Sequence, residues 1–299
     1  MATNRQSAER KEKMMKRWKT TFAALLAALT IFPLAACSSQ EDLGGSQGET
    51  PVPEAPIVPE TPENTPTDTP ADTPPVQTPQ EPETPPKPTT YTYLRCTGNN
   101  VNLRSGAGTS FAVLGQAEEN TMYAITGKVG NWYQTYYRGK TAYVYAEYAA
   151  VFSLPISQNE QVEDVLDEAY KHVGVPYVYG AVRLHDGYGN FLKGFTAQKF
   201  DCSSLVQYVY YQAAGKVLQT TTRTQVKQGK YVKRSELQRG DCLFFTNESR
   251  EHLTGVERVG HVAIYLGNDY ILHTASDYAR IEKMSAKRWG YYLEARRFL

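Results

Sequence analysis

A cysteine and two histidines stand where the sequence predicts a nucleophile and its base. Cys202 follows Asp201 at the start of an apolar stretch with helical spacing, which stops at Gly215. Asp201 is a typical helix N-cap and Gly215 a typical C-cap, so we expect the thiol in the first helical turn. The helix dipole favours an anion there, which predicts a thiol that ionises easily. By itself, such a cysteine is more often a small buried hydrophobic residue.

The two histidines decide between these interpretations. His261 begins an apolar run and His273 ends the next one, with a turn at 267–269 between them. Because side chains alternate along a strand, a two-residue turn at 267–268 puts the histidines on opposite faces of the sheet. A three-residue turn over 267–269, with one residue at positive φ, puts them on the same face. Cys202, His261 and His273 then supply a nucleophile, a base and a residue that orients the base.

Four segments resemble the NlpC-type cell-wall cysteine peptidases. They are FDCSSLV at 200–206, GDCLFF at 240–245, GHVAIYLG at 260–267 and ILH at 271–273. The resemblance covers residues 157–299 and implies an α+β papain-like catalytic domain. It also implies hydrolysis of stem-peptide amide bonds in peptidoglycan, commonly the bond between γ-D-glutamate and an L-diamino acid.

The resemblance assigns roles residue by residue. Cys202 matches the nucleophile, His261 the base and His273 the orienting residue. Asp201 and Ser203 match positions that bind the free amine of an N-terminal L-Ala, and Tyr177 matches a tyrosine near the site. No metal and no cofactor is implied.

Three kinds of departure from the family pattern occur near these motifs. Ser204 and Ala181 replace glycines, Arg239 stands where proline is common, and the 182–199 insertion is longer than the usual connection. None removes a catalytic atom, but the insertion leaves substrate preference open. It is rich in glycine and charge, so we expect a loop, with His185 in solvent.

Residues 91–151 have the short strands and turns typical of a small all-β barrel. VNLRSG at 101–106, GNW at 130–132 and GKTAYV at 139–144 resemble a bacterial SH3-like domain. Ala142-Tyr143 stands where that family often has Gly-Trp. The resemblance implies cell-wall binding or shaping of the neighbouring active site.

The first 36 residues have the pattern of a secretory signal: a basic run at 10–19, then an apolar run at 22–32. Leu34-Ala35-Ala36-Cys37 resembles the lipobox of bacterial lipoproteins, which implies cleavage before Cys37, lipidation of its thiol and anchoring at the cell membrane. A transmembrane anchor is the alternative, although the apolar run is shorter than the roughly 20 residues that a span needs.

Residues 37–90 are rich in proline, threonine and glutamate and have no apolar periodicity. Such a composition predicts a disordered, extended tether that holds the folded part away from the membrane. The formal net charge of the chain is +1. Because residues 37–90 are acidic, the folded part that follows them is mildly basic. No nucleic-acid motif accompanies the basic residues, so we expect no nucleic-acid partner.

Together these features predict a monomeric lipoprotein outside the cytoplasm, whose catalytic domain at 157–299 acts on cell-wall peptides. The chain has four cysteines, Cys37 among them, too few for a disulfide scaffold, and no zinc-binding spacing. Two other functions stay open. The chain could be a non-catalytic wall-binding lipoprotein, or a related thiol amidase or acyltransferase.

Overall fold

The computed structural model describes residues 88–299. The predicted signal segment, the lipidation site at Cys37 and nearly all of the predicted tether lie outside these residues. None of the helices from residue 88 onward is both long and apolar enough to cross a bilayer.

Short antiparallel strands make up the first part of the described chain, as the alternating pattern predicts. Their bounds are β1 (Thr90–Cys96), β2 (Val101–Arg104), β3 (Val113–Ala117), β4 (Met122–Ala124), β5 (Gly127–Val129), β6 (Trp132–Tyr137), β7 (Lys140–Tyr145) and β8 (Ala149–Pro155), with the 3-10 turn η1 (Ala146–Tyr148) before β8. Five of them form one sheet in the order β3-β2-β7-β6-β5. Positive φ values at Gly130 and at Arg138-Gly139 form the tight hairpin turns beside β6.

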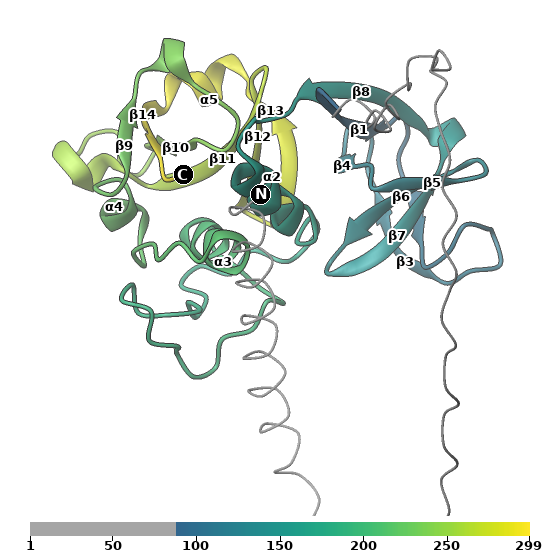
Figure 1. Ribbon diagram of the computed structural model, residues 1–299, viewed down its shortest axis with the longest axis horizontal. Helices are drawn as coiled ribbons and strands as arrows, with labels where there is room; N and C mark the ends of the chain where they lie inside the picture. Colours follow the sequence, from purple (N-terminus) through teal and green to yellow (C-terminus); the bar gives the residue numbers. More distant parts are fainter. Residues whose placement is uncertain (1–87) are drawn as a thin grey trace, which may run out of the picture. The chain divides into compact units, whose positions relative to one another are not determined.

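The rest of the chain folds into helices and a second sheet. The elements are α2 (Glu160–Tyr170), α3 (Cys202–Ala214), α4 (Thr222–Gln225), β9 (Lys230–Val232), η2 (Arg234–Glu236), β10 (Cys242–Phe245), η3 (Gly255–Arg258), β11 (His261–Gly267), β12 (Tyr270–Ala275), β13 (Tyr278–Lys283), α5 (Ala286–Gly290) and β14 (Tyr292–Arg297). The sheet has the order β8-β1-β4-β13-β12-β11-β10-β14-β9, so β1, β4 and β8 belong to it rather than to the five-stranded sheet. This is the α+β papain-like architecture that the sequence predicts, preceded by the small β domain (Figure 1).

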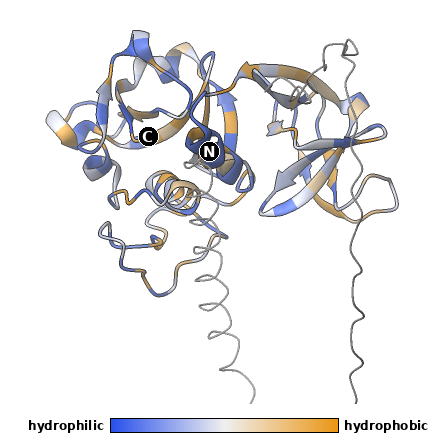
Figure 2. Cartoon of the chain, viewed as in Figure 1, coloured by the Kyte–Doolittle hydropathy of each residue, from blue (hydrophilic) through white to orange (hydrophobic). Residues whose placement is uncertain are grey.

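Helix α3 packs against the strands that carry the histidines. Leu205, Val206 and Val209 are buried on it, and the facing strand β11 is buried from His261 to Leu266. Figure 2 shows hydrophobic residues along α3 and along the central strands, whereas the connecting loops are mostly hydrophilic. Burial of these side chains fixes the distance between the helix start and the sheet.

The ends of α3 lie where the sequence predicts them. The Asp201 side chain accepts from the Ser204 N–H, and the Ser204 side chain accepts from the Asp201 N–H. This reciprocal capping box gives Ser204, which replaces a glycine of the family pattern, a structural function. Gly215 ends the helix in the left-handed region at φ 64°.

Helix α2 begins at the end of the run Ser157-Gln158-Asn159-Glu160, but its cap differs from the one that this run predicts. The sequence suggests a capping box over 157–160, but the N-cap is Asn159, whose side chain accepts from the Gln161 N–H. Ser157 lies outside the helix, where its backbone N–H donates to the Glu163 side chain at 2.7 Å. A carboxylate from within the helix therefore takes the place of the predicted reciprocal contact.

Candidate active site

Helix α3 places Cys202 at its first position, beside strand β11. The residue is 8% exposed. The backbone N–H groups of Ser203 and Val262 lie close enough to its sulfur to lower the pKa of the thiol. Because Val262 follows His261 on β11, this contact holds the thiol next to the strand that carries the first histidine.

The Cys202 thiol is harder to ionise than its place at the helix start suggests. Burial, with the nearby Asp201 carboxylate adding to it, raises the pKa of Cys202 to about 12. The two backbone N–H groups and the Arg183 charge act in the opposite direction without cancelling it. The expectation of an easily ionised thiol is therefore wrong for this state, because desolvation of the thiolate outweighs the helix dipole.

A β-bulge sets the face on which each histidine lies. Tyr265 pairs with Ile271, but the next pair is Gly267 with Tyr270, so Leu266 is the extra residue. The turn itself has two residues, Asn268 and Asp269, both at positive φ. Without the bulge, this turn would put His261 and His273 on opposite faces; with it, they share one. The shared face is the second of the predicted alternatives, although a bulge and a two-residue turn produce it.

The two histidines are in direct contact. Nε2 of His261 lies 2.9 Å from Nδ1 of His273, and both rings are buried. The other ring nitrogen of His273, Nε2, lies 3.3 Å from Oε2 of Glu282 on β13. The contact is a close polar one without the alignment of a hydrogen bond, and this nitrogen has no other partner within residues 88–299.

Glu282 is held in turn by Arg288 of α5. The guanidinium donates to Oε1 of Glu282 from Nε at 3.1 Å and from Nη2 at 2.9 Å. Burial opposes ionisation of the carboxyl, but the contact with His273 and the Arg288 charge lower the pKa of Glu282 to about 2. A permanent negative charge therefore faces His273.

Both imidazoles are neutral at neutral pH. Burial lowers the pKa of His261 well below its usual range, and the neighbouring His273 lowers it further. Burial also lowers the pKa of His273, although Glu282 acts against this. With the Glu282 contact made through His273 Nε2, Nδ1 of His273 accepts from His261 Nε2, and Nδ1 of His261 is the nitrogen that can take a proton.

Tyr177 lies in the same region as Cys202 and Asp201. The segment around it pairs with Phe200: Val178 donates its N–H to the Phe200 carbonyl at 2.9 Å. Burial, followed by the charges of Cys202 and Asp201, raises the pKa of Tyr177 to about 12. The phenol is therefore a protonated donor close to the thiol.

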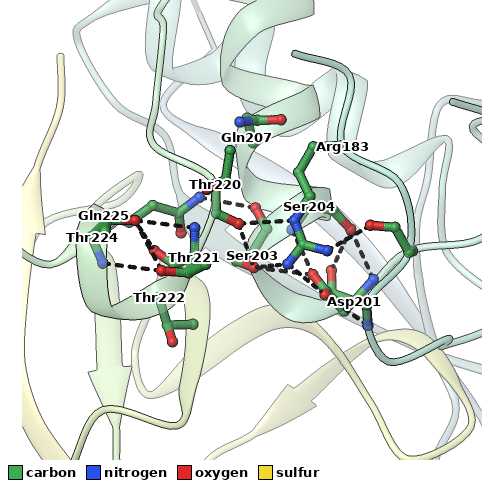
Figure 3. A network of polar contacts seen from close by, with 12 residues as sticks. Arg183, Asp201, Ser203, Ser204, Gln207, Thr220, Thr221, Thr222, Thr224 and Gln225 are labelled. Atoms are coloured by element: carbon green, nitrogen blue, oxygen red, sulfur yellow. Dashed lines mark hydrogen bonds and ion pairs between the residues drawn. The ribbon is translucent and has the colours of Figure 1, made fainter. Parts of the chain in front are cut away.

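Asp201 and Ser203 lie together, but their polar atoms contact the chain itself (Figure 3). The Ser203 hydroxyl donates to Oδ1 of Asp201 at 3.0 Å. Nη2 of Arg183 lies 2.7 Å from Oδ2 of Asp201 and 3.0 Å from the Ser203 hydroxyl. Arg183 belongs to the 182–199 insertion, so this insertion supplies a cation to the predicted amine-binding residues.

The insertion is a loop, as predicted, but His185 is not in solvent. Its ring is fully buried, accepts from the Gly187 N–H at 3.1 Å and packs on Tyr211 of α3. Gln207 of α3 donates to the His185 carbonyl at 3.2 Å. Figure 1 shows this loop beside α3. The glycines and charged residues of the loop gave no indication in the sequence that His185 is buried.

Sequence reasoning missed three polar residues of this region: Glu282, Arg288 and Arg183. Glu282 lies nine residues after His273. In the register of β12 and β13, His273 pairs with Arg280, and Ile271 pairs with Glu282. Alternation along a predicted hairpin was the one signal that pointed to Glu282. No local signal pointed to Arg183, because its contacts with Asp201 and Ser203 span 18 and 20 residues along the chain.

Comparison with known proteins identifies both folded parts. Residues 174–297 match the NlpC/P60 family, and residues 99–150 match the bacterial SH3 domain. The chain thus carries an NlpC/P60 domain. The family resemblance predicted from the cysteine and histidine motifs is confirmed, as is the SH3-like resemblance.

Curated relatives of the NlpC/P60 domain act on glutamyl and peptidoglycan bonds. The chain is 33% identical over 126 residues to the gamma-DL-glutamyl hydrolase of Bacillus subtilis, a match over 42% of this chain and 26% of that protein. It is 31% identical over 140 residues to the peptidoglycan DL-endopeptidase CwlO of Bacillus licheniformis, over 46% of this chain and 28% of that one.

A third relative is the gamma-D-glutamyl-L-lysine dipeptidyl-peptidase of Bacillus subtilis. It is 29% identical over 143 residues, which are 48% of this chain and 42% of that protein. The matched segments therefore span less than half the length of each of these relatives. The similarity is that of one domain.

Proposed function

We propose that the chain is a peptidoglycan hydrolase that cleaves stem-peptide amide bonds, specifically the γ-D-glutamyl–L-diamino acid bond, by thiol catalysis. The observation that carries the proposal is the contact between His261 of β11 and His273 of β12. The backbone N–H of Val262, the residue after His261, lies beside the Cys202 sulfur. Relatives named as peptidoglycan endopeptidases and as a γ-D-glutamyl-L-lysine peptidase support the substrate class.

Cys202 is the nucleophile in this mechanism and His261 the general base. Because the thiol is protonated and the imidazole neutral, we propose that proton transfer accompanies attack rather than preceding it as an ion pair. The sulfur bonds to the carbonyl carbon as its proton moves to Nδ1 of His261. The resulting imidazolium is stabilised through His273 by the Glu282 charge.

The remaining steps follow from the same groups. The backbone N–H of Cys202, at the unpaired start of α3, is suited to the oxyanion of the tetrahedral intermediate. His261 returns its proton to the leaving amine as the C–N bond breaks, which leaves an acyl-thioester. Water then adds to the thioester with His261 as base, and the acid and the Cys202 thiol are released.

Binding residues and location are part of the same proposal. Tyr177, with its protonated phenol near the sulfur, is proposed to contact the substrate. The family resemblance adds Asp201 and Ser203 to the binding residues, and both contact Arg183 in the described structure. Lipidation at Cys37 anchors the protein to the membrane outside the cytoplasm, and residues 37–90 carry domains 91–151 and 157–299 into the wall as a monomer.

Digestion of purified peptidoglycan tests the catalytic assignment. The full-length protein and its Cys202→Ala variant are incubated with peptidoglycan, and the released peptides are identified by mass spectrometry. We expect fragments that end at γ-D-glutamate from the unmodified protein only. A Cys242→Ala variant is the matched control, because Cys242 is also a buried free thiol but lies in β10.

The outcomes separate the possible functions. Fragments from both the unmodified protein and Cys202→Ala, or from neither, would defeat the thiol mechanism. Pull-down of the protein with peptidoglycan without any release of peptides would favour a wall-binding protein. Labelling cells that produce the protein with a radioactive fatty acid, with Cys37→Ser as control, tests the proposed lipidation independently.

A further inference from the structure

The carboxylate of Asp201, beside the proposed nucleophile, is fully occupied by its own chain. Oδ1 accepts from the Ser203 hydroxyl at 3.0 Å and from the Ser204 N–H at 2.8 Å. Oδ2 accepts from the Gly180 N–H at 3.2 Å and contacts Nη2 of Arg183 at 2.7 Å. Each oxygen of the carboxylate thus has two donors, which uses its ordinary acceptor capacity.

The Arg183 guanidinium is itself fixed on three sides. Nε donates to the Thr220 carbonyl at 2.9 Å and Nη1 to the Ala181 carbonyl at 2.6 Å. Nη2 reaches both Asp201 and the Ser203 hydroxyl, as Figure 3 shows. The side chain is 17% exposed, so the cation is part of the folded structure and not a mobile surface group.

The insertion that carries Arg183 is attached beyond this one residue. Leu184 and His185 are buried, and Gln207 of α3 holds the His185 carbonyl. Gln219 donates to the Gly187 carbonyl at 3.1 Å. Displacing the guanidinium therefore requires these contacts to move as well, which opposes exchange of Arg183 for a substrate cation.

We propose that Arg183 determines substrate specificity by taking the position of a substrate ammonium on Asp201. A free amine entering this site meets a guanidinium and a carboxylate that is already neutralised, so it gains nothing and is repelled. An amide-linked amine carries no charge and is tolerated. The enzyme therefore prefers stem peptides whose first amine is acylated, as in intact peptidoglycan, over free peptides.

This inference rests on the proposed function and reverses one expectation taken from the family resemblance. Asp201 and Ser203 then bind the Arg183 guanidinium and do not bind a free L-Ala amine. The guanidinium also offsets the Asp201 charge at Cys202, where Asp201 raises and Arg183 lowers the pKa of the thiol. Loss of Arg183 should therefore slow catalysis as well as change selectivity.

A pair of synthetic peptides tests the proposal with the full-length protein. One is L-Ala-γ-D-Glu-L-Lys-D-Ala with a free amine and the other is its N-acetyl form, each also made with meso-diaminopimelate in place of lysine. The kcat/KM of each is measured at neutral pH. We expect the acetylated peptides to be cleaved at least as fast as the free ones, and roughly ten-fold preference for the free peptides would overturn the proposal.

Variants of Arg183 identify the cause of the preference. Arg183→Met removes the charge, and we expect the ratio of the free to the acetylated rate to rise roughly ten-fold, mainly through KM. Arg183→Lys keeps a cation and should keep the original ratio. Arg223→Met is the matched control, because Arg223 pairs with Glu257 at 3.5 Å and touches neither Asp201 nor Ser203.

The outcomes also separate this proposal from the proposed function. Equal loss of both rates in Arg183→Met, with the ratio unchanged, would make Arg183 merely structural and overturn the inference. If Arg183→Met does not fold, the ratios of the unmodified protein and of Arg183→Lys still decide. If neither peptides nor peptidoglycan are cleaved by the unmodified protein, the proposed function fails instead.

Discussion

Two groups of polar and aromatic side chains, each with a buried centre and a half-buried glutamate, differ in how completely their hydrogen bonds are satisfied. The Arg239 cluster consists of Arg239, Glu163, Tyr93 and Tyr170. The histidine series consists of His261, His273, Glu282 and Arg288. Both connect elements far apart in the sequence, and both contain an arginine paired with a glutamate through two hydrogen bonds.

In the Arg239 cluster every guanidinium donor is used. Nε and Nη2 donate to the two oxygens of Glu163 at 2.8 and 2.9 Å, and the remaining donors reach Tyr93, Tyr170 and the Leu266 carbonyl. Nothing is left to bind a ligand. Arg239, which replaces a common proline of the family pattern, therefore joins β1 and α2 to the turn before β10.

In the histidine series the contacts form a linear chain from Arg288 to His261, and this chain leaves Nδ1 of His261 unused. Arg288 holds Glu282, Glu282 faces His273, and His273 holds His261. The proton-accepting nitrogen of His261 remains for chemistry. The comparison teaches that a saturated buried cluster stabilises the fold, whereas an unsaturated one orients a reactive group.

The sharpest test of this contrast is His261→Ala. We expect kcat/KM on peptidoglycan peptides to fall by about 10²–10⁴-fold, because the proposed base for Cys202 is lost. The melting temperature should change little in comparison. A variant that keeps activity within a factor of a few would show that His261 is not the base.

Arg239→Met should produce the opposite pattern. It leaves the half-buried Glu163 without its counter-charge and the buried Tyr93 and Tyr170 hydroxyls without their donor, so we expect the free energy of unfolding to fall by about 3–5 kcal/mol. The kcat of the folded fraction should stay unchanged. Denaturant unfolding with parallel assays measures both, with Lys287→Met, which breaks the exposed Lys287–Glu248 pair, as a control expected to have almost no effect.

Glu282→Gln removes the charge that ends the histidine series. We expect kcat to fall roughly ten-fold to a hundred-fold, because His273 loses the partner that orients it. The acid limb of the pH profile should also move to lower pH, since Glu282 raises the pKa of His261. Glu282→Asp should restore part of the rate.

Glu294→Gln is the matched control for Glu282→Gln. Glu294 has a similar exposure and also pairs with an arginine, Arg296, but it lies in β14 away from the histidines. An equal loss of activity in both variants would make the Glu282 effect an indirect one. An unchanged pH profile in Glu282→Gln would argue against its orienting function.

The pH dependence of the unmodified protein gives the smallest expected effect. Protonation of His261 removes the base, and burial holds the pKa of His261 well below 6.5, so activity should persist as the pH falls through 6.5 and be lost only below it. Alkylation of Cys202 by iodoacetamide should stay slow up to pH 9, since the pKa of the thiol is about 12. Fast alkylation at pH 6 would indicate a thiolate–imidazolium pair instead.

Local patterns in the sequence determined the helices, the strands and the types of the reactive residues. Asp201 and Gly215 define the ends of α3 through capping, which depends only on neighbouring backbone groups. Alternation predicted β11 and β12, and the cysteine and histidine motifs indicated the family. These features depend on contacts between residues that are close in the chain, so they can be predicted from the sequence.

The tertiary structure alone decided the environment of the reactive groups and the contacts on which the proposed selectivity rests. Burial of Cys202 and His261 reverses the ionisation that the helix start suggests, because desolvation depends on everything packed around a group. The Leu266 bulge decides the face of the histidines, and folding of the insertion brings Arg183 to Asp201. Such contacts join residues far apart in the chain, so no local pattern records them.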